Sequence, residues 1–570
     1  MAEDAKCRRW GLALLILSFA VSVAVRLPLL EAPIGQTRHQ WLTAHVLHTL
    51  RIWSEEGAIQ PHRFLPIMTC ADGANRHIFN VARQEDASGR TYYTSYPLLG
   101  FVLPYLVIRP FDPGISALSL RLFSLAIHGI SGLLVYLLVI ESSRHAPRAV
   151  RRLAPALVPG GRPAQVPGLN AVCQIADGTR SVPATVGGLV GASIYFFTSL
   201  CLWYHCQVYF CDMLVQPLFL AAVLLTMRTA DDDAGRSLGR TWALIGVVFA
   251  MALTEWLGVL FAGVLWIYAL AVLRGRIRWV LAIGVPGAVL AAIVLTLAHF
   301  SLIAGPGAYL GSLMSKFLQR AGVVASEIPS EPNVGPWSPA GWAHVLDRYV
   351  HTFLLMGTFL AAVGLVWLVS ARRGIGEVLR REKGNWGRLA WLIGMPILLH
   401  HLLLFQFTVI HLFALLKSCC LVSVFGGLWF SGFWEGLAQA RTAGYRRLAA
   451  GAIGLVFLLA CGASVRQYYV AAGAPDDCFE QFADTVRHSA ENEDVVFVDG
   501  KVVPQMVLYT RRNIARWEDD EAAAALLRAN RAAAGVIFTV EEDTQRVIGV
   551  RRFAPSAEVA ARTAGGKERK

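Results

Sequence analysis

Long apolar stretches separated by short basic clusters restrict the fold of this chain more than any other feature. A helix needs about 20 apolar residues to cross the hydrocarbon core of a bilayer. Only 16% of the 570 residues are charged, whereas soluble domains contain about a quarter. We therefore expect a polytopic α-helical membrane protein with about eleven transmembrane helices. The predicted spans are residues 10–30, 115–140, 184–204, 208–227, 242–254, 256–273, 279–298, 353–370, 389–405, 410–430 and 448–463.

The basic clusters between these spans indicate how the chain is oriented, because cytoplasmic loops carry the excess of Lys and Arg. If the short, proline-interrupted stretch 96–111 does not span, five clusters fall on the side of the N-terminus. They are residues 144–152, 228–240, 274–278, 372–383 and 441–447. We therefore expect a cytoplasmic N-terminus and an outer C-terminal region. The formal charge of +13 then reports orientation and a membrane-lipid partner, and it predicts no nucleic-acid partner.

The predicted topology divides the chain into three parts. Residues 1–470 form the transmembrane module, with a large first outer loop at 31–95 and a second at 299–351. In residues 471–556, strand-like and helix-like runs alternate, which predicts a small α/β domain on the outer face. Residues 557–570 end in GGKERK and are expected to be disordered. The first apolar run lacks a small-residue cleavage site, so we expect a retained span rather than a signal peptide.

The outer face receives polar residues that a membrane anchor does not need. Asp212 stands at the outer start of a span. An ionised carboxylate in hydrocarbon costs several kcal/mol, so this acid is expected either to face a protein cavity or to cap its helix. Glu255 separates two half-length helices and is expected to bind a cation, orient an arginine or expose a polar turn. The first outer loop contributes five histidines: His39, His45, His48, His62 and His77.

No cofactor is required by this pattern, and a divalent metal is the only candidate. His400, His411 and Glu255 are weak ligand candidates, because no HxxxH or HxH pairing occurs on a single element. The ten cysteines contain no CxxC pair and are interpreted as small buried hydrophobes. Cys70 and Cys478 would both face an oxidising compartment, where they could pair.

Several short segments resemble a known family in the family's own order. YHCQVYFCDMLVQPLFL at 204–220 resembles a segment of the polyprenyl-phosphate-dependent sugar transferases with the GT-C fold, which include protein O-mannosyltransferases and lipid A aminoarabinose transferases. TRHQWLTA at 37–44 is similar to the first-loop motif of a bacterial subgroup. The other matching segments are TSYPLLGFVLPYL at 94–106, RLFSL at 121–125, VIHLFALLK at 409–417 and VFVDGKVVPQMVLYTRRN at 496–513.

This resemblance implies a GT-C-like membrane module that performs an inverting sugar transfer. A sugar would leave an undecaprenyl- or dolichyl-phosphate donor and pass to a glycan, lipid or protein acceptor on the outer, periplasmic face of a bacterial inner membrane. Such chemistry needs a base near the acceptor hydroxyl and cationic or hydrogen-bonding groups on the leaving phosphate.

The base is the point at which this sequence departs from the family. The resemblance implies a carboxylate in the first loop, but Arg38-His39-Gln40-Trp41 contains no acid. Glu31, His39 and Asp212 therefore remain as alternative candidates for the base. Arg38 and Arg121 are candidates for the donor phosphate, since guanidinium offers bidentate geometry. The other predicted substrate-binding residues are Gln40, Tyr96, His411 and Lys417.

Two other functions are compatible with the sequence. A transporter or flippase of lipid-linked sugars should show repeated halves and polar groups near the middle of the membrane. No convincing repeat is visible, and the acids and histidines gather at one face. A catalytically inactive GT-C relative is the third hypothesis, because the first-loop acid is missing.

Overall fold

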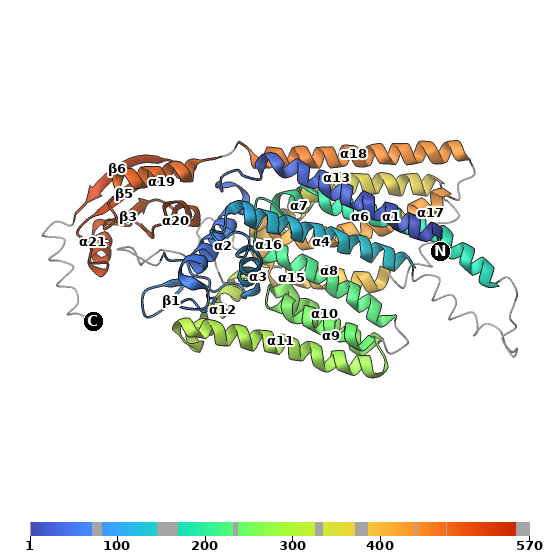
Figure 1. The fold of residues 1–570 in the computed structure, drawn as a ribbon, viewed down its shortest axis with the longest axis horizontal. Coiled ribbons are helices and arrows are strands. Elements are labelled where there is room, and N and C mark those ends of the chain that lie inside the picture. The colour runs from blue at the N-terminus through green and yellow to red at the C-terminus, as the bar shows by residue number, and fades with distance from the viewer. Residues whose placement is uncertain are drawn as a thin grey trace.

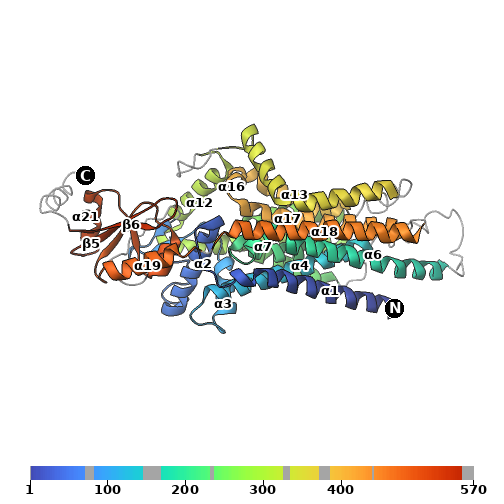
Figure 2. The ribbon, with the colours of Figure 1, turned by 90° about the horizontal axis from the view of Figure 1, so that it is seen from above.

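The computed structural model describes residues 2–70, 83–144, 169–231, 237–324, 334–370, 386–438, 442–474 and 476–554. Helices lie side by side in an elongated bundle, and a small sheet domain is attached to one end (Figures 1 and 2). The N-terminus lies toward the opposite end of the bundle. Most of the predicted basic clusters 144–152 and 372–383, and the predicted disordered tail, fall outside the described residues.

The bundle contains long helices with shorter pieces between them. Its helices are α1 (Ala2–Arg26), α3 (Leu99–Ile108), α4 (Ala117–Arg144), α6 (Leu169–Phe197), α7 (Ser199–Tyr204), α8 (Cys211–Ala230), α9 (Ser237–Ala252), α10 (Trp256–Val272), α11 (Gly275–Ala304), α13 (Pro339–Ser370), η5 (Ala390–Gly394), α15 (Met395–Leu403), α16 (Phe405–Ile410), η6 (Leu412–Leu415), α17 (Leu416–Ala438) and α18 (Ala443–Ala472).

Seven helices of the described chain are long and apolar enough to cross a membrane, and the protein is a multi-pass membrane protein. These segments are Arg9–Leu29, Ala117–Ser143, Cys211–Ala230, Gly275–Ala304, Pro339–Val366, Leu412–Leu437 and Ala443–Ala472. Four shorter apolar helices accompany them: Leu99–Ile108, Val182–Phe197, Leu238–Ala252 and Trp256–Val272. The predicted number of about eleven spans therefore stays a prediction.

The spans differ in how deeply they are buried, and this difference locates the core. In α8 and α17, 72% of the most apolar stretch is buried, against 22% in α1 and α11. Exposed side chains such as Ile283 and Leu448, each 73% exposed, face the position of lipid. Small residues let α6 and α17 approach closely: a Cβ atom on Gly187 would lie 2.6 Å from the carbonyl oxygen of Gly427.

The predicted division of residues 242–273 into two helices is confirmed. Helix α9 ends at Ala252 and α10 begins at Trp256. Glu255 caps α10, with an extended backbone and a carboxylate that accepts a hydrogen bond from the Leu257 amide at 2.8 Å. The helix is therefore interrupted at a charged side chain that caps the N-terminus of α10 and lies in the protein interior.

Two predicted spans contain a break in the helix, and their crossing of the membrane stays a prediction. Residues 389–405 are divided among η5, α15 and the start of α16, with a break at Leu404. Residues 184–204 are divided at Thr198 between α6 and α7. Apolar composition cannot report such breaks, because irregular backbone at membrane depth is tolerated wherever neighbouring protein satisfies its polar groups.

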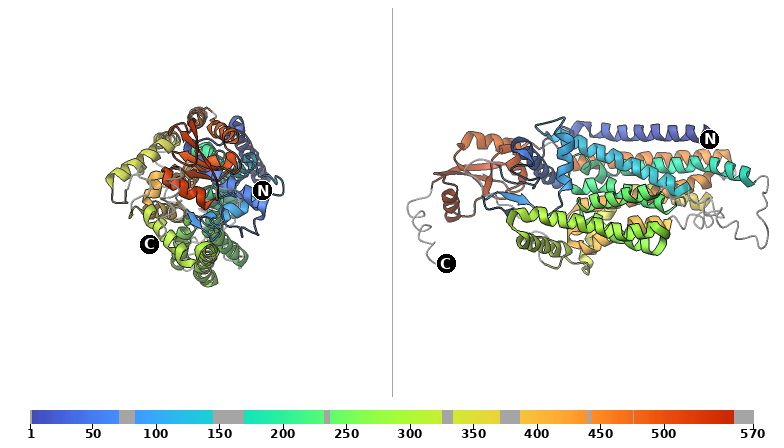
Figure 3. Two further views of the ribbon diagram at one scale, coloured as in Figure 1. Left: turned by 90° about the vertical axis from the view of Figure 1, so that its left-hand side faces the viewer. Right: turned by 60° about the horizontal axis from the view of Figure 1, so that its bottom comes forward.

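A layer of short elements lies between the bundle and the C-terminal domain (Figures 1 and 3). It contains η1 (Leu27–Leu29), η2 (Thr37–His39), α2 (Gln40–Ile52), η3 (Trp53–Gly57), the antiparallel strands β1 (Arg83–Glu85) and β2 (Thr91–Tyr93), and α12 (Pro306–Ala321). Helix α3 has ten residues, about 15 Å at 1.5 Å per residue. It is too short to cross a hydrocarbon core of about 30 Å, as the orientation argument requires.

The C-terminal region is a small α/β domain, as predicted. It contains α19 (Cys478–Ser489), β3 (Val495–Asp499), α20 (Pro504–Thr510), β4 (Ile514–Arg516), α21 (Asp520–Ala529), β5 (Gly535–Val540) and β6 (Val547–Phe553). The strand order is β4-β3-β5-β6, with β3 parallel to β4 and β5, and β6 antiparallel to β5. One sheet face packs on α19 and α20, through residues such as Phe482 and Met506, and the other on α21 through Leu527.

Candidate active site

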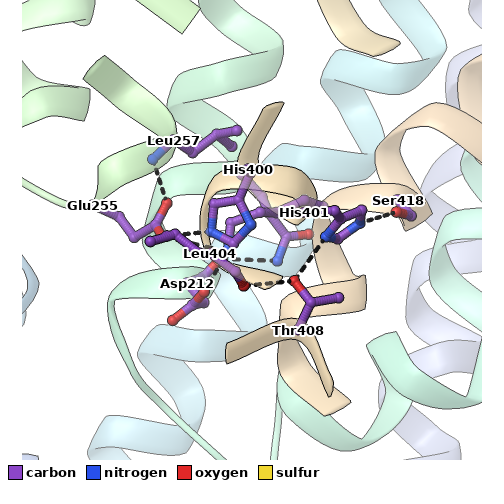
Figure 4. Close-up of polar contacts among 10 residues, drawn as sticks. Asp212, Glu255, Leu257, His400, His401, Leu404, Thr408 and Ser418 are labelled. Atoms are coloured by element: carbon purple, nitrogen blue, oxygen red, sulfur yellow. Dashed lines mark hydrogen bonds and ion pairs between the residues drawn. The ribbon is translucent and has the colours of Figure 1, made fainter. Parts of the chain in front are cut away.

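Four buried ionisable side chains meet at the end of the bundle nearest the C-terminal domain. The Lys417 ammonium, from α17, lies 2.5 Å from Asp212 Oδ1 on α8 and 3.5 Å from Glu255 Oε1. His400 Nε2, on α15, lies 3.2 Å from the same Glu255 oxygen. Figure 4 shows Asp212, Glu255 and His400 gathered around one point. We call these four residues the acid–lysine cluster.

The acid–lysine cluster is closed to solvent and incompletely paired. The side chains of Asp212, Lys417 and His400 are 0% exposed and that of Glu255 is 1% exposed. Asp212 Oδ2 and His400 Nδ1 have no hydrogen-bond partner in the described chain. Asp212 does not cap its helix, because Phe210 occupies the N-cap position. The capping alternative is therefore wrong, and one carboxylate oxygen of Asp212 is left for another group.

A second group of polar side chains holds this cluster in place. The Tyr349 hydroxyl, on α13, lies 2.7 Å from His401 Nε2 and 2.6 Å from Ser418 Oγ. His401 Nδ1 lies 3.1 Å from Thr408 Oγ1, and Figure 4 shows His401, Thr408 and Ser418 beside His400. His401 and Ser418 follow His400 and Lys417 in the chain, so these bonds restrict the two cluster residues.

A second set of residues places basic side chains next to the acid–lysine cluster. We name this set, Arg38, His39, Tyr204, Arg348 and His411, the basic pocket; Arg38 is exposed, and the other four are half-buried or buried. His39 Nδ1 lies 2.9 Å from the Tyr204 hydroxyl, and its ring centroid lies 5.6 Å from that of His411. Arg348 Nη1 and His411 Nδ1 are buried without a partner in the described chain. Neither arginine forms an ion pair with a described carboxylate, which leaves positive charge for an anion.

Phe407 and Arg320 connect the two groups. The Phe407 ring lies 5.9 Å from His400 and 4.8 Å from His411, measured between centroids. The Arg320 guanidinium, from α12, lies 5.3 Å above Phe407 and 4.8 Å above Tyr96. Burial alone would lower the pKa of Arg320, but the neighbouring tyrosines and the acids of the cluster raise it. A charged Arg320 is therefore held over the boundary between the cluster and the pocket.

The backbone that carries Arg38 and His39 is strained. Both residues have left-handed conformations, with φ values of 37° and 69°. The Trp203 indole donates a hydrogen bond to the Arg38 carbonyl at 3.2 Å. Non-glycine residues remain in this region only where the surrounding structure holds them, and such strain concentrates at functional sites.

Three predicted site residues lie elsewhere. Glu31 is exposed and pairs with no described residue. Arg121 is buried, and its Nη1 donates to the carbonyls of Leu30 and Ala32 at 2.7 Å each. Gln40 accepts from the Gly35 amide at 3.0 Å. In the described chain, Arg121 and Gln40 thus stabilise the first loop, and neither contacts the acid–lysine cluster.

Sequence reasoning missed Arg348, Tyr349 and Tyr204, and gave Arg320 no role. The available signal was the charged pair Asp347-Arg348, which lies about one turn before the apolar run that begins at Phe353. An intramembrane arginine without an acid four residues away is a candidate for an anionic ligand. Arg348 lies outside the predicted span, which begins at residue 353.

The cluster does not fit a resident divalent metal. Among the described residues, no three His, Cys, Asp or Glu side chains are arranged to hold an ion. The Lys417 ammonium already lies between the carboxylates of Asp212 and Glu255. The predicted metal site at His400, His411 and Glu255 is therefore not supported by the geometry.

The first-loop histidines have different contact partners. His48 Nε2 lies 3.0 Å from the Met68 carbonyl, and His62 pairs with Glu56 at 2.8 Å. The His45 ring packs 4.3 Å from Tyr93, and its Nε2 is buried without a partner in the described chain. His77 lies outside the described residues. Each of these described histidines therefore makes its own contacts within the first loop.

Replacing His45 with phenylalanine is expected to reduce the acid sensitivity of the protein. Burial lowers the pKa of His45 to about 3. The unfolded chain, with a pKa near 6.5, binds more protons below that pH, so stability falls as pH falls. The cost for this one group is about 2 kcal/mol at pH 5 relative to pH 8. Thermal unfolding in nanodiscs at both pH values should show a smaller drop for His45→Phe. The control is His344→Phe, which replaces an exposed histidine and should show the same drop as wild type. An equal drop in wild type and His45→Phe would contradict this expectation.

Solved structures share this architecture, although no protein-family model and no curated protein matches the chain. ArnT from Cupriavidus metallidurans, solved alone and bound to undecaprenyl phosphate, has a TM-score of 0.53 and 11% identity. The match covers 96% of this chain and 98% of ArnT. The chain has the GT-C fold.

A second GT-C structure agrees. The archaeal oligosaccharyltransferase AglB from Archaeoglobus fulgidus, in complex with an inhibitory peptide and a dolichol-phosphate, has a TM-score of 0.54 and 12% identity. The match covers 93% of this chain and 69% of AglB. At such identities the comparison establishes the GT-C fold, and function has to be argued from the site.

Proposed function

We propose that this GT-C protein is a membrane glycosyltransferase that moves a sugar from a polyprenyl-phosphate donor to a glycan, lipid or protein acceptor. One observation carries the proposal: a closed acid–lysine cluster adjoins a basic pocket whose arginines have no described acidic partner. Transfer from a phosphate donor requires these two environments side by side, one for the hydroxyl proton and one for the leaving phosphate.

The basic pocket is the site for the donor phosphate in this proposal. Arg348 and Arg38 supply guanidinium groups, which bind phosphate oxygens in pairs. Burial, reinforced by the charges of Arg348 and Arg38, lowers the pKa of His39 to about 4. His39 is then neutral at pH 7 and a poor proton acceptor. We therefore assign His39 and His411 to hydrogen bonding with the phosphate rather than to the role of base.

Asp212 is the proposed base. Lys417 pairs with Oδ1 and favours the ionised carboxylate, and Oδ2 remains unpaired in the described chain. The acceptor oxygen bonds to the anomeric carbon as the bond from that carbon to the phosphate oxygen breaks. The hydroxyl proton passes to Asp212, and the phosphate leaves with the electron pair, stabilised by the basic pocket. Attack opposite the leaving group inverts the anomeric centre.

A transfer assay tests the proposal. Purified protein in nanodiscs would be incubated with a set of radiolabelled polyprenyl-phosphate sugars and envelope extract, and covalent products would be separated from donor. We expect product with at least one donor. Movement of donor across sealed vesicles without covalent product would instead identify a flippase, and the absence of both would indicate an inactive relative. Mass spectrometry of envelope glycans from a strain lacking the protein would identify the sugar and its acceptor.

We place the site on the periplasmic face of a bacterial inner membrane, with the N-terminus in the cytoplasm. The N-terminus and the C-terminal domain lie at opposite ends of the bundle (Figure 1), and basic residues between the spans favour this orientation. Labelling of introduced cysteines with a membrane-impermeant reagent in intact cells tests the placement. A variant at exposed Asp543 of the C-terminal domain should react only if that domain is outside.

Chelation of metal ions is expected to leave transfer unchanged. The positive charge that a divalent ion would place between Asp212 and Glu255 is already supplied by Lys417. Transfer rates in excess EDTA and in added Mg²⁺ or Mn²⁺ should therefore agree. Activity that disappears in EDTA and returns with metal would contradict the assignment of Lys417 as the resident cation.

A further inference from the structure

The C-terminal domain contacts the strained turn that carries the basic pocket. We define the donor turn as residues 34–39, which end in Arg38 and His39. The Ile34 amide donates to the Tyr509 hydroxyl at 2.8 Å, and Gln505 Nε2 donates to the Gly35 carbonyl at 2.9 Å. Gln505 and Tyr509 both belong to α20 of the C-terminal domain.

Helix α20 is shared between two hydrophobic cores. Met506 and Val507 belong to the core of the C-terminal domain, whereas Leu508 belongs to the main core of the membrane module. A helix whose opposite sides are buried in two cores cannot shift relative to either without exposing apolar surface. Figure 1 shows α20 between the strands of the domain and α2. The contacts of α20 with the donor turn are therefore made from a fixed position.

The donor turn is also confined from its other side. The Gly35 amide donates to Gln40 Oε1, and a Cβ atom on Gly35 would lie 3.4 Å from the Cβ atom of Asp476. Gly35 thus lies between the first helix of the loop, which accepts a hydrogen bond from its amide, and Asp476 of the C-terminal domain. Removal of the hydrogen bonds from α20 would free the residues that precede Arg38.

A second attachment of the C-terminal domain to the first loop lies outside the donor turn. Asn513 accepts from the Cys70 amide at 2.7 Å and donates to the Cys70 carbonyl at 3.3 Å. Arg511 pairs with Glu55. These contacts join the domain to the first loop, but they do not touch the donor turn.

We propose that α20 positions the donor turn, so that Gln505 and Tyr509 are positioning residues for the donor phosphate. This inference rests on the proposed function, because the proposed function assigns the donor phosphate as the ligand of this turn. Arg38 and His39 have backbone conformations that are unfavourable on their own. Helix α20 offsets this cost by holding Ile34 and Gly35 through hydrogen bonds. The C-terminal domain thereby contributes to the phosphate site.

The test uses the full-length protein in nanodiscs and two conservative substitutions, Gln505→Leu and Tyr509→Phe. The double variant is expected to raise KM for the donor about 10- to 30-fold with little change in kcat, since each lost bond contributes about 1 kcal/mol. The Kd for undecaprenyl phosphate, used as the probe, should rise by the same factor. Tyr469→Phe is the matched control, because it removes a tyrosine hydroxyl bonded to the Val25 carbonyl elsewhere.

A readout without turnover separates this inference from the proposed function. Amide hydrogen exchange over residues 34–40 should accelerate in the double variant and remain unchanged in Tyr469→Phe. Unchanged exchange and unchanged probe affinity would overturn the inference even if transfer is observed. Faster exchange and weaker probe binding in a protein that transfers no sugar would support positioning and reject the proposed reaction. A fall in kcat with unchanged KM would also overturn it.

Discussion

Asp212→Asn is expected to lower kcat for sugar transfer by about 10²- to 10⁴-fold, the range supplied by a positioned general base. Asparagine has nearly the same size as aspartate but cannot take the acceptor proton. KM for the donor should change little, because Asp212 lies in the acid–lysine cluster and not among the basic-pocket residues. Initial rates across donor concentrations in nanodiscs provide the measurement.

The control for this prediction is Glu255→Gln, which removes the other carboxylate beside Lys417. Losing one partner of a buried ion pair destabilises a protein by about 3–5 kcal/mol, so both variants are expected to unfold at lower temperature than wild type. If Asp212 is the base, only Asp212→Asn loses transfer well beyond what its folded fraction explains. Equal activity in the two variants would reject Asp212 as the base and leave Glu31 as the remaining carboxylate candidate.

Arg348→Gln is expected to raise KM for the donor about 10- to 150-fold, because a hydrogen bond to a charged group contributes about 1.5–3 kcal/mol. Its Nη1 is buried and unpaired in the described chain, so the substitution breaks no ion pair there and should leave folding largely intact. Arg348→Lys should recover only part of the affinity, since lysine cannot bind two phosphate oxygens in the planar arginine geometry. Binding of undecaprenyl phosphate and steady-state kinetics should agree.

Arg109→Gln is the matched control for Arg348, because Arg109 is exposed and stacks only on the Tyr105 ring in the described chain. It should keep the wild-type donor KM. If the two variants behave alike, the basic pocket does not bind the donor phosphate. If Arg348→Gln instead lowers kcat alone, Arg348 acts on the transition state and not on donor binding.

Much of the architecture was predictable because it depends on local composition. The apolar runs predicted a membrane bundle, and the change of period after residue 478 predicted the α/β domain. The break before Glu255 was also predictable, since a charged residue interrupts an apolar run that is too long for one helix. The breaks at Thr198 and Leu404 were not, because no proline, glycine or charged residue marks either position in the sequence.

The site was predictable as a set of separate candidates. Asp212, Glu255, His400 and Lys417 each stood out as a polar residue beside apolar sequence, and each therefore needed a partner. The pairing between them could not be predicted from the sequence, because Asp212 and Lys417 are 205 positions apart. Arg121 illustrates the opposite error. It was predicted to bind the donor phosphate, but its described partners are backbone carbonyls of the first loop.

The sequence by itself determined that the chain enters a membrane, where its helices lie and which polar residues require burial, because these properties follow from hydropathy and periodicity along the chain. Only the tertiary structure decided that Lys417 neutralises Asp212, that Arg348 joins the basic pocket and that α20 holds the donor turn. Each of these depends on which buried surfaces pack together. Packing between helices distant in sequence leaves no local pattern, since lipid and protein interiors accept the same apolar side chains.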